Sequence, residues 1–245
     1  MSEQYRITRE KLSSKWSVER CIPYFQAHTN TYSPLEILRE KFEEALSLDG
    51  VVGLNIATRA DCLEDDTVAY LSELAERTVL TVELGLQSVH DKTAMLINRG
   101  HSYAEFVEGY NKLRGASPKI NICIHLIFGL PEESDEMMLE SVKEVASLRP
   151  EQVKLHLLHV LKSSRLGEVY ESGGYVPLER GRYIELVVKS LELLPPETVI
   201  ARLTGDGMSE DLLAPEWSKR KVSVINDIDK MLFETNTYQG RLWQG

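Results

Sequence analysis

Polar side chains stand at the ends of five apolar segments that have the composition of β-strands. They are Gln26 with His28, Thr58 with Arg59, Glu83 with Gln87, His125, and His156 with His159. The carboxyl ends of parallel strands meet at one edge of a sheet, and ligands bind there. Burying so many polar groups without a ligand would leave hydrogen bonds unmade. The pattern therefore predicts a binding mouth, although each single histidine is better explained as an ordinary core or loop residue.

One of these segments, 121–128, reads N-I-C-I-H-L-I-F and leads into a G-L-P turn at 129–131 and then a serine helix start. Side chains alternate between the two faces of a strand, so Cys123, His125 and Ile127 share one face. A buried strand, a glycine turn and a helix form the unit from which parallel α/β folds build ligand sites.

Several known catalytic signatures are missing from the sequence. There is no P-loop, no G-x-S-x-G nucleophile elbow, no H-E-x-x-H zinc motif and no G-x-G-x-x-G after the first strand. Cys21, Cys62 and Cys123 form no C-x-x-C pair, so a metal site built from these three alone is not expected. His125 and His156 leave open an unrelated barrel metalloenzyme, which zinc analysis would test.

Composition narrows the class of protein. The chain has 245 residues and a formal net charge of −10, which argues against bulk binding to nucleic acid but not against a local basic groove. No apolar run reaches the length of a membrane span, and the polar first twenty residues do not resemble a signal peptide. We therefore expect a cytoplasmic protein with no membrane partner.

The elements that position the polar residues follow from the hydrophobic periodicity. Strands are expected at 21–27, 51–57, 78–86, 121–128 and 152–160, with a further one at 198–203. Helices are expected at 33–48, 64–76, 91–97, 134–148, 178–194 and 222–235, and another begins at Ser102. Ser33 with Glu36 predicts a capping box. In the last helix, Val222, Ile225 and Leu232 are expected to face inward.

Strands and helices alternate five times at a spacing of roughly thirty residues, which predicts right-handed crossovers and a parallel sheet. The periodicity alone leaves open a doubly wound sheet or a barrel. The missing G-x-G-x-x-G makes a dinucleotide-binding fold less favoured. After about residue 165 the alternation loosens, so we expect a barrel in 1–165 and a C-terminal extension in 166–245.

Six motifs in this sequence resemble those of one family in their residues and in their order along the chain. They are Y-F-Q-A-H-T-N-T-Y (24–32), A-T-R-A-D (57–61), E-L-G-L-Q-S-V-H-D-K-T (83–93), I-N-R-G-H (97–101), H-L-I-F-G-L-P (125–131) and K-L-H-L-L-H-V (154–160). The chain resembles the YhcC/YtqA-like radical SAM proteins, which are related to the Elongator catalytic subunit and to oxygen-independent coproporphyrinogen oxidase. The similarity covers the chain from Cys21 to its end.

The resemblance implies an α/β fold, a partial (β/α)6 TIM-like barrel that binds S-adenosylmethionine across its mouth. Gln87 would hold the ribose or methionyl part, and Arg99 is carried over as a second contact. His125 stands where the family often has a ribose-binding aspartate. Ile127 and Gly129 would form the wall against adenine.

The loop after the first strand of this sequence departs from the family pattern. Gln26-Ala27-His28-Thr29 replaces the glycine-rich turn that normally receives the methionyl amine, so Gln26 and Thr29 are expected to take over contacts there. Glu83 and His159, at two other strand ends, complete the expected cofactor-binding set.

A larger departure concerns the family's [4Fe–4S] cluster. Its C-x-x-x-C-x-x-C loop, expected before Cys21, is absent, and Fe–S clusters need thiolate ligands. We therefore expect an N-terminally truncated member that lacks the first barrel strand and the cluster loop.

Two functions follow from the resemblance. One is a radical SAM enzyme that cleaves S-adenosylmethionine reductively to a 5′-deoxyadenosyl radical, with an electron donor as partner and, by kinship, a tRNA wobble uridine as substrate. The other is a non-catalytic remnant that binds S-adenosylmethionine or a partner without a cluster.

Overall fold

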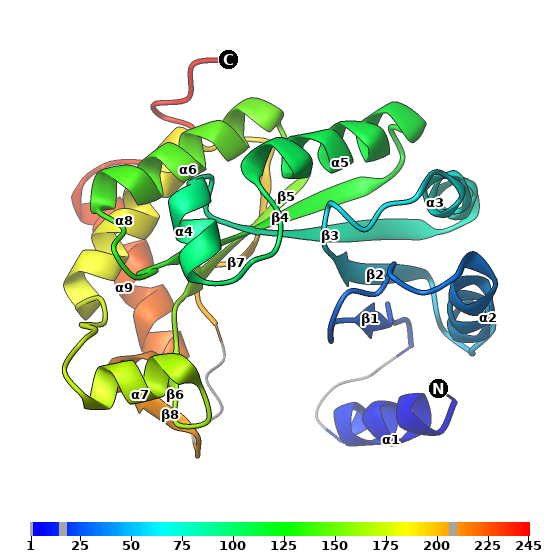
Figure 1. Ribbon diagram of the computed structural model, residues 1–245, viewed down its shortest axis with the longest axis horizontal. Helices are drawn as coiled ribbons and strands as arrows, with labels where there is room; N and C mark the ends of the chain where they lie inside the picture. Colours follow the sequence, from blue (N-terminus) through cyan, green and yellow to red (C-terminus); the bar gives the residue numbers. More distant parts are fainter. Residues whose placement is uncertain (1, 15–18, 206–209) are drawn as a thin grey trace. The chain divides into compact units, whose positions relative to one another are not determined.

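The computed structural model describes residues 2–14, 19–205 and 210–245. Within them, one parallel six-stranded sheet has the order β1-β2-β3-β4-β5-β7, and β6 pairs antiparallel with β8 (Figure 1). The strands are β1 (Tyr24–Phe25), β2 (Gly53–Thr58), β3 (Val79–Gln87), β4 (Asn121–Phe128), β5 (Gln152–Leu157), β6 (Val160–Leu161), β7 (Val199–Arg202) and β8 (Leu212–Ala214).

Helices precede, connect and follow the strands of the large sheet. They are α1 (Ser2–Ser13), α2 (Leu35–Leu46), α3 (Asp65–Arg77), α4 (Asp91–Leu96), α5 (Tyr103–Ala116), α6 (Asp135–Leu148), α7 (Arg165–Glu171), α8 (Arg180–Leu193) and α9 (Lys221–Glu234), with a short 3₁₀ helix η1 (Glu216–Lys219). The predicted α/β class is confirmed, because strand and helix alternate from β1 to β5.

The strand order resolves the choice between the two sheet topologies. In a doubly wound sheet the order reverses at a switch point. Here each strand of the large sheet instead follows the previous one in chain order, from β1 to β5 and then β7. Sequential parallel order is that of a (β/α) barrel or of part of one.

The chain divides into two compact units. The first contains 1–85 and 104–123, and the second contains 86–103 and 124–245. In the first unit, the ring of Phe42 packs edge-on against Phe25 at 4.9 Å between centroids and stacks on Tyr70 at 6.4 Å. In the second unit, α8 packs against both α6 and α9 (Figure 1). The predicted boundary at residue 165 stays a prediction, but β7, which lies beyond it, pairs with β5.

Three predicted details of the elements are wrong. The helix predicted from Ser33 begins at Leu35 instead, because Pro34 takes an extended conformation and serves as the N-cap without a side-chain hydrogen bond. β5 ends at Leu157, since Val160 and Leu161 form a separate strand that pairs with β8. Val222 is 71% exposed rather than inward, because Val224 and Ile228 form the buried face of α9.

Other predicted elements are confirmed with close boundaries. β4 spans Asn121–Phe128 as expected, and Ser134 caps α6 by accepting a hydrogen bond from the main-chain N–H of Met137. Among the helices that the structure describes, we find none with the length and hydropathy of a membrane-spanning segment.

Candidate functional site

The loop after β1 is held by Asn30 and Thr31. The Asn30 amide Nδ2 donates to the carbonyl oxygens of Phe25 and Ala57, both at 2.9 Å, and its main-chain N–H donates to Ala57 O at 3.2 Å. The Thr31 hydroxyl lies 2.6 Å from that of Thr58. These bonds join the exits of β1 and β2, so the motif's asparagine and second threonine stabilise the loop. Gln26 stands on the same loop with an exposed side chain.

Thr29, the other residue predicted in this loop, is half-buried beside Asn30. Its carbonyl oxygen accepts a hydrogen bond from the main-chain N–H of Tyr32 at 3.3 Å. His28 adopts a positive φ of 64°, which is uncommon for a residue other than glycine.

One face of the sheet in the first unit carries polar side chains. Parallel register places Tyr24 beside Asn55 and Asn55 beside Thr81, and it places Ala57 beside Glu83. Glu83 is only 1% exposed, and its carboxylate accepts a hydrogen bond from the Tyr24 hydroxyl at 2.7 Å.

Two further groups add to this face. The Cys123 thiol lies within 4.8 Å of a Glu83 carboxylate oxygen, and the buried Asn55 Oδ1 has no hydrogen-bond partner among the described residues. This face therefore presents hydrogen-bond acceptors, one of them a buried carboxylate, to a ligand that donates hydrogen bonds.

In the second unit, Gln87 ends β3 in an unusual turn. Its φ is +61°, and the N–H of Ser88 donates to the carbonyl oxygen of Leu86 at 2.7 Å. An i to i+2 hydrogen bond across a residue with positive φ makes a γ-turn of the rare, strained kind. The half-buried Gln87 side chain is thus held at the carboxyl end of a central strand.

Arg99 fixes this turn. All three of its guanidinium nitrogens donate to main-chain carbonyl oxygens. Nη1 donates to Leu86 at 2.7 Å and also to Ser88, while Nε and Nη2 donate to His101 at 2.9 and 2.8 Å. The side chain is 3% exposed, and Nη2 lies 3.6 Å from an Asp91 carboxylate oxygen.

The residues after the turn are tied to α6 and the loop before it. The Ser88 hydroxyl donates to the Glu133 carboxylate and accepts from the N–H of His90 at 3.1 Å. The N–H of Val89 donates to the Ser141 hydroxyl at 3.2 Å. Burial raises the pKa of Glu133 above its ordinary value, while the hydrogen bond from Ser88 acts in the opposite direction.

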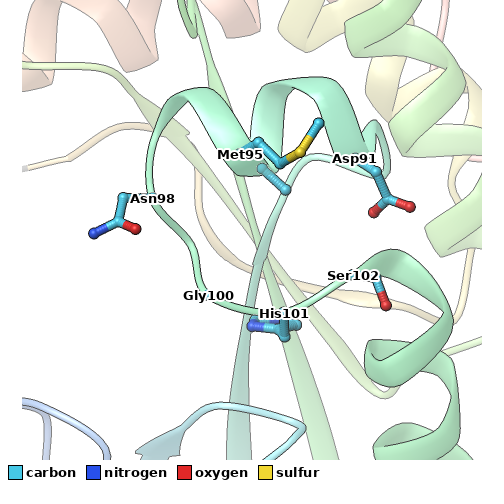
Figure 2. A pocket seen from close by; sticks show the side chains of 7 residues that line it. Asp91, Met95, Asn98, Gly100, His101 and Ser102 are labelled. Atoms are coloured by element: carbon cyan, nitrogen blue, oxygen red, sulfur yellow. The ribbon is translucent and has the colours of Figure 1, made fainter.

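A cavity of about 450 Å³ lies between α4 and the loop that leads to α5 (Figure 2). Its lining residues are Asp91, Ala94, Met95, Asn98, Gly100, His101 and Ser102. The Asp91 carboxylate also accepts a hydrogen bond from the N–H of Tyr103, at 2.7 Å, and so satisfies the first turn of α5.

The remaining predicted residues lie on β4 and beyond β5, within the second unit. The rings of His125 and His156 are 5.2 Å apart and tilted by 45°. Ile127 is half-buried on the same face of β4 as His125. His159 packs against Gly205, where an added Cβ would lie 3.2 Å from its ring carbon Cε1.

Gly129 serves a packing role as well. Its φ is +86°, its carbonyl oxygen accepts the Tyr175 hydroxyl at 2.6 Å, and its N–H donates to the sulfur of Met138 at 3.2 Å. An added Cβ would lie 3.2 Å from Leu178. Burial raises the pKa of Tyr175 to about 12, so the hydroxyl stays protonated and donates.

The cysteines do not meet the requirements of an iron–sulfur cluster. Cys21 lies 3.1 Å from the Tyr5 hydroxyl, Cys62 follows β2, and Cys123 is buried in β4. Burial raises the pKa of Cys62, which disfavours the thiolate that binds metal. Within the described residues, no three ligand atoms within 4.8 Å of one another include two of these cysteines. The residues of this chain therefore do not fit the cluster.

The metalloenzyme alternative built on His125 and His156 stays a hypothesis. In the part of the chain that the structure describes, no set of three candidate ligands within 4.8 Å contains both His125 and His156.

Family models match most of the chain. The radical SAM superfamily model matches residues 15–145, and the radical SAM C-terminal domain model matches residues 150–234. The chain belongs to the radical SAM superfamily. YtqA of Bacillus subtilis (strain 168) is 48% identical over 98% of this chain and 74% of its own length. YhcC of Escherichia coli (strain K12) is 31% identical over 99% of this chain and 80% of its own.

A solved structure shows a similar fold. The archaeal Methanocaldococcus infernus Elp3 with an N-terminal deletion superposes with a TM-score of 0.77 at 18% identity, covering 95% of this chain. This chain spans 58% of that structure. At the sequence level, Elongator complex protein 3 of Bos taurus is 30% identical over 65% of this chain and 29% of its own length. The predicted resemblance to YtqA, YhcC and the Elongator subunit is confirmed.

The predicted cofactor residues thus fall into two groups. The first unit holds Gln26, Thr29 and Glu83, and the second holds Gln87, Arg99, His125, Ile127, Gly129 and His159. Sequence reasoning missed Tyr24, Asn30, Glu133 and Tyr175, whose roles depend on hydrogen bonds to partners distant in sequence. For Asn30, the T-N-T triplet between two strands was an available signal, because asparagine side chains often bond to nearby backbone.

Proposed function

We propose that this chain binds S-adenosylmethionine at the carboxyl ends of its parallel strands, as its part in radical SAM chemistry. The observation that carries the proposal is the γ-turn at Gln87. Strained main chain persists where the surrounding structure enforces it, and such positions cluster at ligand sites. Family membership supplies the identity of the ligand, since S-adenosylmethionine is the source of the 5′-deoxyadenosyl radical in this superfamily.

The residues present suit this ligand. The Gln87 amide can both donate to and accept from a ribose hydroxyl. The Glu83 carboxylate in the first unit is buried and bonded to Tyr24, and a carboxylate is a suitable acceptor for an ammonium or hydroxyl group. Gln26 is exposed on the loop after β1 and could contact the methionyl end.

The cluster is a separate matter, because Cys21, Cys62 and Cys123 do not fit it. We therefore derive no electron transfer from the residues of this chain. The second candidate function is a non-catalytic protein that binds S-adenosylmethionine or a partner without a cluster. It is favoured because no three-ligand group among the described residues contains two of the cysteines.

A tRNA substrate is proposed on the relationship to the Elongator subunit. Lys162 and Arg165 are exposed where β6 leads into α7, and they are the surface cations that we assign to phosphate contacts. Lys154 in β5 is only 8% exposed and is not assigned to this role. If tRNA binds there, gel-shift affinity should fall steeply with salt and lose part of its salt dependence in a Lys162→Glu, Arg165→Glu variant. A salt-independent response would contradict the proposal.

Isothermal titration of the 245-residue protein with S-adenosylmethionine tests the main proposal. Binding is expected for the wild-type protein, and Gln87→Ala should weaken it about tenfold, or about 1.4 kcal/mol. Lys92→Met is the matched control, because Lys92 is exposed on the neighbouring helix α4 and pairs with Glu132. The proposal would be contradicted if the wild-type protein gave no binding heat with S-adenosylmethionine or with its analogue S-adenosylhomocysteine.

A further inference from the structure

Arg99 is a buried cation whose hydrogen bonds are directed to the main chain. Its side chain is 3% exposed, and every guanidinium nitrogen donates to a carbonyl oxygen. A buried charge is costly unless hydrogen bonds and an opposite charge compensate it. Here the carbonyl dipoles and the Asp91 carboxylate, 3.6 Å away, provide that compensation.

Two of these hydrogen bonds fix the main chain on either side of Gln87. One nitrogen, Nη1, bonds to both Leu86 and Ser88, the residues on either side of Gln87. The Leu86 carbonyl oxygen also accepts the Ser88 N–H that closes the γ-turn, so both of its lone pairs are used. Rotation of the main chain at Gln87 would break at least one of these bonds.

We propose that Arg99 is a positioning residue for S-adenosylmethionine binding that acts through Gln87 and does not contact the ligand's carboxylate. This inference rests on the proposed function and gives Arg99 an indirect role in place of the direct contact that the family resemblance implies. Only a planar fork of donors can bridge two carbonyls and reach a third, so lysine cannot replace arginine here.

Two ligands distinguish positioning from direct contact. S-adenosylmethionine has a carboxylate, whereas 5′-methylthioadenosine has the same nucleoside without the amino-acid end. Arg99→Lys keeps the charge but loses the fork, so it should weaken titration by both ligands by the same factor, about tenfold. A loss confined to S-adenosylmethionine would show that Arg99 contacts the carboxylate and would overturn the inference.

A double-mutant cycle tests the coupling to Gln87. If Arg99 acts through Gln87, the variant carrying Arg99→Lys and Gln87→Ala should bind S-adenosylmethionine no more weakly than Gln87→Ala alone. Additive losses would mean that the two residues act independently, and they would contradict the inference. Lys92→Met again serves as the control, and it should leave the affinities for S-adenosylmethionine and 5′-methylthioadenosine unchanged.

A ligand-independent measurement separates this inference from the proposed function. Hydrogen exchange at the Ser88 amide should speed up in Arg99→Lys and not in Lys92→Met, whether or not the wild type binds S-adenosylmethionine. An unchanged exchange rate at the Ser88 amide would overturn this inference and leave the proposed function untouched.

A glycine variant keeps the test available if Arg99→Lys does not fold. Glycine adopts positive φ without strain, so adding Gln87→Gly should restore part of the lost melting temperature. No restoration would show that Arg99 supports the fold by another route, and the inference would then fail.

Discussion

The side chain of Gln87 is held in place by backbone strain that a distant arginine sustains. A non-glycine residue in the left-handed region costs about 1–3 kcal/mol of folding free energy. The bonds from Arg99 to Leu86 and Ser88 offset that cost. The proposed ligand contact at Gln87 and the hydrogen bonds that hold its main chain therefore belong to different residues.

Glu133 gives a pH prediction at the residue scale. Burial raises its folded-state pKa, so between the ordinary value of 4.5 and that raised value the folded protein binds more protons than the unfolded chain. The free energy of unfolding should therefore fall as pH rises through this window. Urea unfolding across the window should show this slope, and Glu133→Gln, which still accepts from Ser88, should flatten it. An identical slope in the variant would contradict the assignment.

The sequence indicated which strand ends carry polar side chains, but it did not indicate the hydrogen-bond partners of those side chains. Gln87 and Arg99 were both assigned to the cofactor, and both assignments stay predictions, although Arg99 is hydrogen-bonded to the main chain on either side of Gln87. A guanidinium group donates hydrogen bonds to carboxylates and to main-chain carbonyl oxygens in the same way. The sequence does not show which of these acceptors lies near Arg99. The wall against adenine at Gly129 stays a prediction, and the sequence did not indicate that the Gly129 carbonyl oxygen accepts a hydrogen bond from the Tyr175 hydroxyl.

At the element scale, the helix α5 carries two glycines with opposite environments. An added Cβ at Gly109 would lie 2.1 Å from the carbonyl oxygen of Ala60, whereas one at Gly115 meets nothing within 4 Å. Gly109→Ala should therefore destabilise the protein by at least about 1–3 kcal/mol through overpacking. Gly115→Ala should stabilise it by about 0.5–1 kcal/mol, because alanine is the better helix former.

Thermal unfolding of the two variants, measured side by side, checks this pair. Equal effects would show that helix propensity alone governs α5 and that the contact with Ala60 is easily relieved.

Element boundaries were predictable where periodicity and caps agreed. β4 and α6 follow the sequence closely because an apolar run, a glycine turn and a serine cap occur in succession. The start of α2 was missed because Pro34 adopts an extended conformation and displaces Ser33 from the cap position. The end of β5 was missed because Val160 and Leu161 pair with β8, a strand more than fifty residues later in the chain.

At the scale of the whole molecule, the separation of the cysteines predicts a negative result in reconstitution. Anaerobic treatment of the 245-residue chain with iron and sulfide should not yield one [4Fe–4S] cluster per chain, since its thiolate ligands are not gathered. Iron and acid-labile sulfide content, with the visible absorbance spectrum, are the measurements.

A Cys123→Ser variant serves as the control for reconstitution, and it should behave like the wild type. A stoichiometric cluster that disappears in this variant would show that the cysteines assemble in a way the structure does not contain.

The order of the sheet also bears on how the chain is made. From β1 to β5, each strand pairs with the one that precedes it in the chain. Contacts between neighbouring segments form faster than distant ones, and nascent chains fold from the N-terminus. Each strand leaving the ribosome therefore finds its pairing edge already synthesised. β7 is the exception, because it reaches β5 only after α7 and α8 have been translated. Until then, the far edge of β5 is exposed to chaperones and to other nascent chains.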